Sequence, residues 1–322
     1  MPQVKHRVEG AVGIIELDNP PHQFMTLQMV GELDELTERW EGDPSVRAIV
    51  ITGTKPGTFI THFSVEELAE ATKNLPTGGV PGPVKAAVSG LLRGIDRGQR
   101  LLGHAPALRR SIESGMRRTP LHGMLDVLAI HRVFSRLECM DKAVIAAING
   151  TAMGGGCELT LACDYRLMAR GDNVIGLIEV LAAIIPGAGG TQRLARTVGQ
   201  ARAVEMLLDG VLLGPDEAER VGLVTRAVDA HELMGEAMAL ARRMATRPLA
   251  AVGHAKRAVR VGASLPIDDG LAFEQLAFIM AGMCADANIA RDYYLDAFRS
   301  GRSAREIFGR LRSGDGPTFQ GT

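Results

Sequence analysis

Residues 143–158 read AVIAAINGTAMGGGCE. The first six residues are apolar and predict a short buried strand, which Asn149-Gly150 closes. Three consecutive glycines follow at 154–156, and a helical pattern then continues through Ala162. Glycines between a strand and a helix leave the first backbone amides of the helix open to a ligand. This arrangement suits an anion or a developing oxyanion.

Glu158 lies three residues after Gly155, about one helical turn further on, so its carboxylate can reach the same space. A carboxylate beside an oxyanion site is what proton transfer next to a carbonyl requires. Two other interpretations stay open: the glycines only permit close packing, or they form a dinucleotide loop. Because the sequence has neither GxGxxG nor GxxxxGK[ST], the nucleotide motifs fit poorly.

Glu179 is a second carboxylate of interest, in the otherwise apolar stretch 174–180 (VIGLIEV), eight residues before Gly187. An acidic residue among apolar ones either faces solvent or is placed for function with a raised pKa, and spacing alone leaves both open. Two carboxylates with opposite protonation duties can add water across an activated double bond.

The rest of the chain predicts an α/β body followed by helices. Apolar patterns predict strands in residues 4–18 (two, meeting at Glu9-Gly10), 47–52, 165–169 and 223–228. Helical periodicity occupies 25–40 and 125–140, so strand and helix alternate as in parallel βαβ units. Every segment beyond about residue 230 has a helical pattern. We therefore divide the chain into a core, 1–230, and a helical C-terminal region, 231–322.

The composition limits the class of protein. The 322 residues include 36 Lys and Arg against 37 Asp and Glu, a formal net charge of -1, and 46% are hydrophobic. Such a chain is globular, and its balanced charge offers no general attraction to nucleic acid or an anionic membrane. We expect no membrane span and a cytoplasmic location, because the sequence has no long apolar run and no signal-peptide pattern. We also expect no metal site and buried, reduced thiols at Cys139, Cys157, Cys163 and Cys284.

Residues 72–120 differ from the rest of the chain. They hold nine Lys and Arg against two acidic residues, with several Gly and Pro. This composition predicts a basic insertion with short helices such as 84–102. A solvated basic surface and a lid that contacts substrate both stay open. Since the total charge is near zero, the remainder of the chain is acidic overall.

Residues 143–158 and 185–194 (IPGAGGTQRL) together resemble the enoyl-CoA hydratase/isomerase, or crotonase, superfamily, and residues 47–53 (RAIVITG) agree. The resemblance covers about 4–70 and 125–300. It implies a crotonase-like spiral of ββα units with a helical C-terminal trimerisation region, in a homotrimer or a dimer of trimers. It also implies an acyl-CoA thioester substrate, with CoA as part of the substrate and no separate cofactor.

The resemblance also assigns roles by position. The amides of Phe63 and Gly155 match the donors to the thioester oxygen. Glu158 matches the glutamate that activates water, Glu179 the one that exchanges a proton at the α-carbon, and Gly187 a backbone position beside the catalytic water. The residues expected to contact CoA or the acyl group are Phe24, Thr61, His62, Ser64 and Val65. Having both glutamates favours hydratase chemistry over isomerase, dehalogenase or hydrolase chemistry.

Residues 59–64 (FITHFS) depart from the family's common Phe-x-Ala-Gly-x-Asp. His62 replaces a glycine next to the oxyanion donor and Ser64 replaces an acid, so the loop takes another path or narrows the CoA entrance. A structural or surface role for His62 and a catalytic or thioester-contacting role both stay open. Ile178 replaces the usual proline before the second glutamate. The basic insertion enters between the two oxyanion segments, and we expect its arginines to cap the site or meet CoA phosphates.

The sequence therefore predicts a lyase that adds water to a 2-enoyl-CoA, giving a 3-hydroxyacyl-CoA. The first alternative is another crotonase reaction, such as double-bond isomerisation or cleavage of a β-hydroxyacyl thioester. The second is a non-catalytic, crotonase-like scaffold that binds RNA or a protein partner through the basic insertion, although the balanced charge leads us to expect no nucleic acid.

Overall fold

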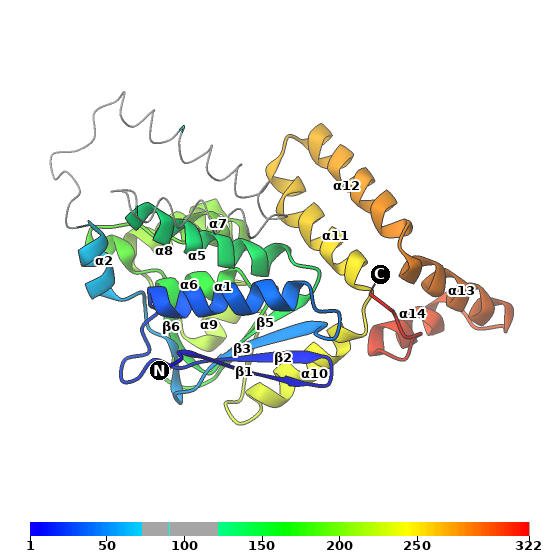
Figure 1. Cartoon of the computed structure of the whole chain (residues 1–322), viewed down its shortest axis with the longest axis horizontal. Helices are drawn as coiled ribbons and strands as arrows, with labels where there is room; N and C mark the ends of the chain where they lie inside the picture. The colour runs from blue at the N-terminus through cyan, green and yellow to red at the C-terminus, as the bar shows by residue number, and fades with distance from the viewer. Residues whose placement is uncertain (73–89, 91–121, 322) are drawn as a thin grey trace.

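The computed structural model describes residues 1–72, 90 and 122–321 (Figure 1). The predicted basic insertion at 72–120, with its expected helix at 84–102, lies almost wholly outside these residues. The described part consists of an α/β body and a set of C-terminal helices.

The larger sheet begins with an antiparallel hairpin whose strands meet at the predicted turn. Strands β1 (Val4–Glu9) and β2 (Val12–Leu17) form this hairpin. The remaining strands are parallel to β2, and the order is β1-β2-β3-β5-β7-β9. Their bounds are Ala48–Gly53 for β3, Ala143–Ile148 for β5, Tyr165–Ala169 for β7 and Arg226–Val228 for β9.

A smaller parallel sheet has the order β4-β6-β8. Its strands are Gly57–Ile60, Gly150–Met153 and Ile175–Gly176. Each follows a strand of the larger sheet and precedes a helix, so that β4 leads to α2 (Val65–Thr72), β6 to α6 (Gly155–Leu161) and β8 to the 3-10 helix η1 (Glu179–Ala182). This repeated step is the predicted spiral of ββα units and confirms the fold class.

Both faces of the larger sheet are covered, which explains the continuous apolar runs of its central strands. Ile49 and Ile51 pack in one core cluster with residues of α1 (Leu27–Glu41) and α5 (His122–Cys139). Ala48 and Val50 pack in a second cluster with α10 (Leu233–Ala245). The predicted division at residue 231 therefore precedes a helix that packs on the sheet.

Four short helices complete the body and connect it to the C-terminal helices. They are α7 (Gly190–Val198), α8 (Gln200–Asp209), α9 (Pro215–Arg220) and α11 (Leu249–Arg260). After η2 (Gly262–Ser264), three helices project from the body: α12 (Ile267–Gly282), α13 (Ala285–Arg299) and α14 (Ala304–Ser313) (Figure 1). We call these three the C-terminal arm.

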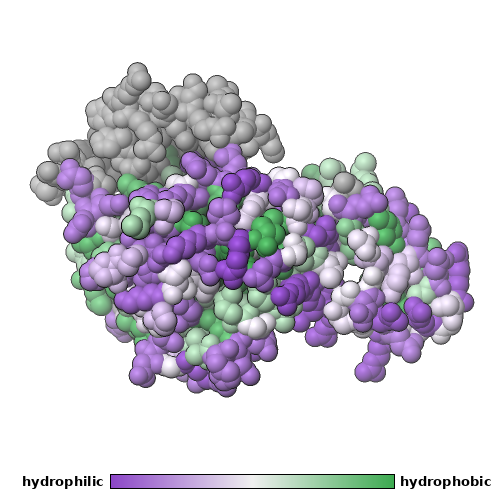
Figure 2. Space-filling view, turned by 60° about the horizontal axis from the view of Figure 1, so that its bottom comes forward, coloured by the Kyte–Doolittle hydropathy of each residue, from purple (hydrophilic) through white to green (hydrophobic). Residues whose placement is uncertain are grey.

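The C-terminal arm extends to one side of the body, with apolar patches among its polar residues (Figure 2). Within the described ranges, no single helix is long and apolar enough to cross a membrane; α12 and α13 pass that test only as a pair, bent by 76°.

Candidate active site

The glycines after β5 allow the β4 and β6 segments to approach each other closely. A Cβ at Gly150 would lie 1.9 Å from the carbonyl carbon of Gly57, and one at Gly156 would lie 2.2 Å from the carbonyl oxygen of Ile60. Such distances exclude any side chain at either position. Close approach therefore places the loop that follows β4, residues 61–64, beside the first turn of α6.

The Phe63 amide lies beside Gly155, the first residue of α6. Phe63 forms a parallel bridge with Met25, in which the Met25 amide donates to the His62 carbonyl at 2.9 Å and the Ser64 amide donates to the Met25 carbonyl at 2.8 Å. This pattern turns the Phe63 amide away from Met25. A Cβ at Gly155 would lie 3.4 Å from the Phe63 nitrogen. Gly155 begins α6, where amides have no acceptor within the helix. Two such amides are the donors that a developing oxyanion requires.

Glu158 lies one turn into α6 and is 3% exposed. Its Oε1 accepts hydrogen bonds from the Ala188 amide at 2.8 Å and from the Gly190 amide at 2.7 Å. Burial, together with a smaller effect of the Glu179 charge, raises the pKa of Glu158 to about 7, whereas the two amides and Arg193 oppose the rise. A carboxylate with a pKa near neutrality is suited to general base catalysis.

Glu179 begins η1 and is half-buried. Its Oε1 lies 3.2 Å from the point that a Cβ at Gly154 would occupy, so the carboxylate sits beside the start of α6. Its Oε2 is buried and has no hydrogen-bond partner among the residues that the structure describes. Burial raises the pKa of Glu179, against hydrogen bonds from the local backbone and the charge of His62. Partial burial therefore makes this carboxyl easier to protonate than an exposed one.

A sequence model of the family described as "Enoyl-CoA hydratase/isomerase" matches residues 116–296. The same residues supply α6, η1 and α7, around which both glutamates and the Gly155 amide are arranged. This chain belongs to the enoyl-CoA hydratase/isomerase family. It is accordingly an enzyme of the hydratase type.

Individual relatives agree with this assignment. The chain is 30% identical over 285 residues to a short-chain-enoyl-CoA hydratase from Clostridium acetobutylicum, covering 88% of this chain and 90% of that protein. It is 42% identical over 153 residues to a crotonyl-CoA hydratase from Syntrophomonas wolfei, covering 48% and 57% respectively. A solved enoyl-CoA hydratase structure from Bacillus anthracis superposes with a TM-score of 0.71 at 27% identity, covering 99% and 100%.

The residues expected to contact the substrate of this hydratase-family enzyme lie in different settings. The rings of Phe24 and His62 stack at 4.5 Å, and Phe24 stacks on His22 at 5.1 Å. The Thr61 hydroxyl donates to the His22 carbonyl at 2.9 Å. Ser64 is buried, and its hydroxyl accepts a hydrogen bond from the Glu67 amide at the start of α2, while Val65 is exposed. Among these, Phe24 and His62 stack on each other, and the Cβ of His62 lies near the start of α6, as Glu179 does.

His62 is the departure from the family pattern that bears most directly on the glutamates. Its Cβ lies 3.4 Å from the Cβ point of Gly154, which Glu179 also approaches. Its Nδ1 is 2.7 Å from the Phe63 carbonyl oxygen. Since a carbonyl only accepts, Nδ1 is the donor in this hydrogen bond. His62 therefore lies beside the start of α6, as Glu179 does, and its ring is hydrogen-bonded to the loop that carries the Phe63 amide.

Sequence reasoning missed the two amides that hold Glu158. Gly187, predicted to lie beside the catalytic water, is exposed, and a Cβ there would have open space around it. The hydrogen bonds to Glu158 come from the next residues, Ala188 and Gly190. A Cβ at Gly190 would lie 2.9 Å from Glu158 Oε1, which explains why position 190 is a glycine. The glycine cluster at 187–190 indicates that the backbone there approaches another group closely, but the sequence does not show which amides point toward Glu158.

The cysteines and other potential ligands form no metal centre in the described residues: no three His, Cys, Asp or Glu side chains are grouped to hold an ion. All four cysteines are free thiols. The expectation of burial is correct for Cys157 and Cys163 but wrong for Cys139 and Cys284, which are half-buried because they lie at helix ends.

Proposed function

We propose that this enzyme hydrates a 2-enoyl-CoA to a 3-hydroxyacyl-CoA. The observation that carries the proposal is the pairing of a buried carboxylate, Glu158, and a half-buried one, Glu179, beside the neighbouring amides of Phe63 and Gly155. One carboxylate, Glu158, accepts two backbone hydrogen bonds, and the other, Glu179, has a buried oxygen without a partner. Their environments differ, which is how two carboxyls take opposite proton-transfer roles. The hydratase names of the relatives support the same reaction.

In the proposed mechanism, the thioester oxygen accepts hydrogen bonds from the Phe63 and Gly155 amides. Ionised Glu158 removes a proton from water, and the resulting hydroxide forms a bond to the β-carbon. The electron pair of the double bond moves toward the thioester, where the two amides stabilise the enolate. Protonated Glu179 then delivers its proton to the α-carbon. One water is added, and each turnover leaves Glu158 protonated and Glu179 ionised until protons exchange with solvent.

The remaining predicted residues complete the proposed substrate site. Phe24 and His62 form a wall beside the thioester, and the neighbouring positions Thr61, Ser64 and Val65 shape the loop that CoA passes. Gly187 provides backbone near the catalytic water. CoA enters as part of the substrate, and no separate cofactor takes part in the proposed chemistry.

We also propose that the enzyme is a homotrimer or a dimer of trimers assembled through the C-terminal arm. In α12 only Ala277 is buried, whereas large apolar side chains are exposed on the single chain: Ile267, Leu271, Leu276, Phe278, Ile279 and Met280. A helix that is apolar on all sides is buried in its functional state. Sedimentation should give three or six times the 34.3 kDa chain mass. A monomer at micromolar concentration would contradict the proposal.

The test of the reaction is to incubate the enzyme with short and long 2-enoyl-CoAs. We expect loss of the conjugated thioester absorbance and formation of the 3-hydroxyacyl-CoA. A product with a shifted double bond would identify an isomerase, and release of a shorter acyl-CoA would identify a lyase that cleaves carbon–carbon bonds. The altered loop at His62 is the observation that keeps those reactions in view. No turnover together with salt-sensitive RNA binding would favour the scaffold instead.

A further inference from the structure

Gly189 and Gly190, at the start of α7, leave space for two different side chains, one on each side of the backbone. A Cβ at Gly190 would press on Glu158 Oε1 at 2.9 Å. A Cβ at Gly189, whose φ is +97°, would lie 2.3 Å from an Arg193 guanidinium nitrogen. The segment 188–190 therefore has Glu158 on one side and the Arg193 guanidinium on the other.

Arg193 is 8% exposed and binds this segment through the Ala188 carbonyl. Its Nη1 donates to the Ala188 carbonyl at 2.8 Å, while the Ala188 amide donates to Glu158. Its Nε and Nη2 donate to Glu138 Oε2 on α5 at 3.1 and 2.9 Å. Each nitrogen of the guanidinium thus has a hydrogen-bond acceptor, the Ala188 carbonyl or the half-buried Glu138 carboxylate, and these acceptors fix its position.

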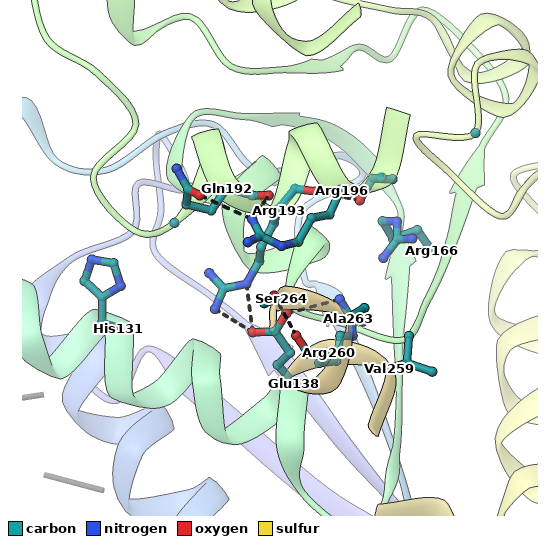
Figure 3. Close-up of a pocket in the computed structure, with 13 residues that line it drawn as sticks. His131, Glu138, Arg166, Gln192, Arg193, Arg196, Val259, Arg260, Ala263 and Ser264 are labelled. Atoms are coloured by element: carbon teal, nitrogen blue, oxygen red, sulfur yellow. Dashed lines mark hydrogen bonds and ion pairs between the residues drawn. The ribbon is translucent and has the colours of Figure 1, made fainter. Parts of the chain in front are cut away.

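Glu138 connects the arrangement to the C-terminal part of the chain. Its other oxygen accepts from Arg260, on α11, at 3.1 Å. Figure 3 shows Arg193 and Arg260 directed at Glu138 from α7 and α11. These residues border an open cavity of about 770 Å3, which neither Glu158 nor Glu179 lines. Arg193, Glu138 and Arg260 therefore lie outside the space around the two glutamates.

We propose that Arg193 is a positioning residue for Glu158, holding the 188–190 segment whose amides bind that carboxylate. Glu138 keeps the guanidinium in place, and Arg260 connects it to the helix that leads to the C-terminal arm. The proposal rests on the proposed function, in which Glu158 activates water. Arg193 does not touch substrate in this account, so it acts on the rate through the ionisation of Glu158.

The charged and titratable groups that face Glu158 are Glu179 from η1, Cys157 from its own helix and Arg193 from α7. Of these, only Arg193 favours the ionised carboxylate, by its charge and by holding the carbonyl of Ala188, whose amide donates to Glu158. Without it, the pKa of Glu158 rises. Hydration needs the ionised form, so the acidic limb of its pH profile moves to higher pH.

The test is the pH profile of hydration in Arg193→Gln, Arg193→Lys and the matched control Arg196→Gln. Arg196 is exposed and lines the same cavity, and among the described residues it donates only to Gln192 within α7. In Arg193→Gln we expect the ratio of kcat at pH 6 to kcat at pH 9 to fall at least about threefold, with KM little changed. Arg193→Lys, which keeps the charge, should recover part of that ratio, and Arg196→Gln should match wild type.

Glu138→Gln should also move the acidic limb of the pH profile to higher pH. The double variant Glu138→Gln with Arg193→Gln should shift that limb no further than the more affected single variant does. Thermal unfolding identifies variants that lose only stability. Activity reduced equally at every pH, or an unmoved limb in Arg193→Gln, would overturn the proposal. A wild type without an acidic limb, or an active Glu158→Gln, would refute the proposed function instead, so the two failures are distinguishable.

Discussion

Gly155→Ala separates the catalytic role of the α6 start from its structural role. An added Cβ would lie 3.4 Å from the Phe63 nitrogen, 3.6 Å from Met25 Sδ and 3.6 Å from the Phe63 Cβ, all ordinary contacts. Gly155 does not have a positive φ, and alanine favours a helix, so the fold should be as stable as wild type or slightly more stable. The methyl group would nevertheless occupy the space between the two amides.

A thioester oxygen could then no longer accept hydrogen bonds from both amides. Loss of one oxyanion donor costs about 10²–10³ in kcat, or roughly 2.7–4 kcal/mol. We expect that loss in hydration of a 2-enoyl-CoA, measured from the thioester absorbance, with an unchanged melting temperature. The paired variant Gly156→Ala places its Cβ 2.2 Å from the Ile60 carbonyl oxygen and should instead destabilise the fold by about 1–3 kcal/mol. A stable Gly155→Ala with kcat within about threefold of wild type would refute the oxyanion assignment.

Three further predictions concern the neighbouring groups. Burial raises the pKa of Glu158 to about 7, so its ionisation lowers the stability of the native state as pH rises from the unfolded-state pKa toward 7. Glu158→Gln can still accept hydrogen bonds from both amides and should therefore be more stable than wild type. In denaturant unfolding we expect a gain of up to roughly 3 kcal/mol at pH 8 and little gain at pH 4. No gain at pH 8 would contradict the burial cost. His62→Gly removes a side chain whose charge lowers the pKa of Glu179, so that pKa should rise and the pH profile of hydration should change, whereas His22→Gly on the far side of Phe24 should leave the profile unchanged. Equal profiles for the two variants would exclude His62 from the site. Deleting residues 76–119 should change Michaelis constants across acyl chain lengths, and unchanged constants would show that the insertion has no part in substrate binding.

The sequence was sufficient to predict the larger sheet because its central strands are short, continuous apolar runs with helices on both sides. The smaller sheet was missed. Its strands β4, β6 and β8 have two to four residues, and β6 begins in the Asn149-Gly150 turn signal. Pairing across the spiral, rather than local propensity, makes these segments strands.

The candidate site was predictable where a side chain carries the signal. Glu158 and Glu179 could be singled out because an acid in an apolar or glycine-rich setting needs an explanation. The amides of Ala188 and Gly190 could not, since every residue but proline has such a donor and only the chain path decides where it points. The contact of His62 with Phe24 depends in the same way on how two loops meet.

The central claim is that two glutamates divide the proton transfers of one hydration. Its most direct test is kcat for a 2-enoyl-CoA at pH 8 in wild type, Glu158→Gln and Glu179→Gln, with melting temperatures as the control for folding. General acid–base groups contribute about 10²–10⁴ each, so we predict that both variants stay folded and each loses at least about 100-fold in kcat. Wild-type turnover in either variant would contradict the two-glutamate mechanism.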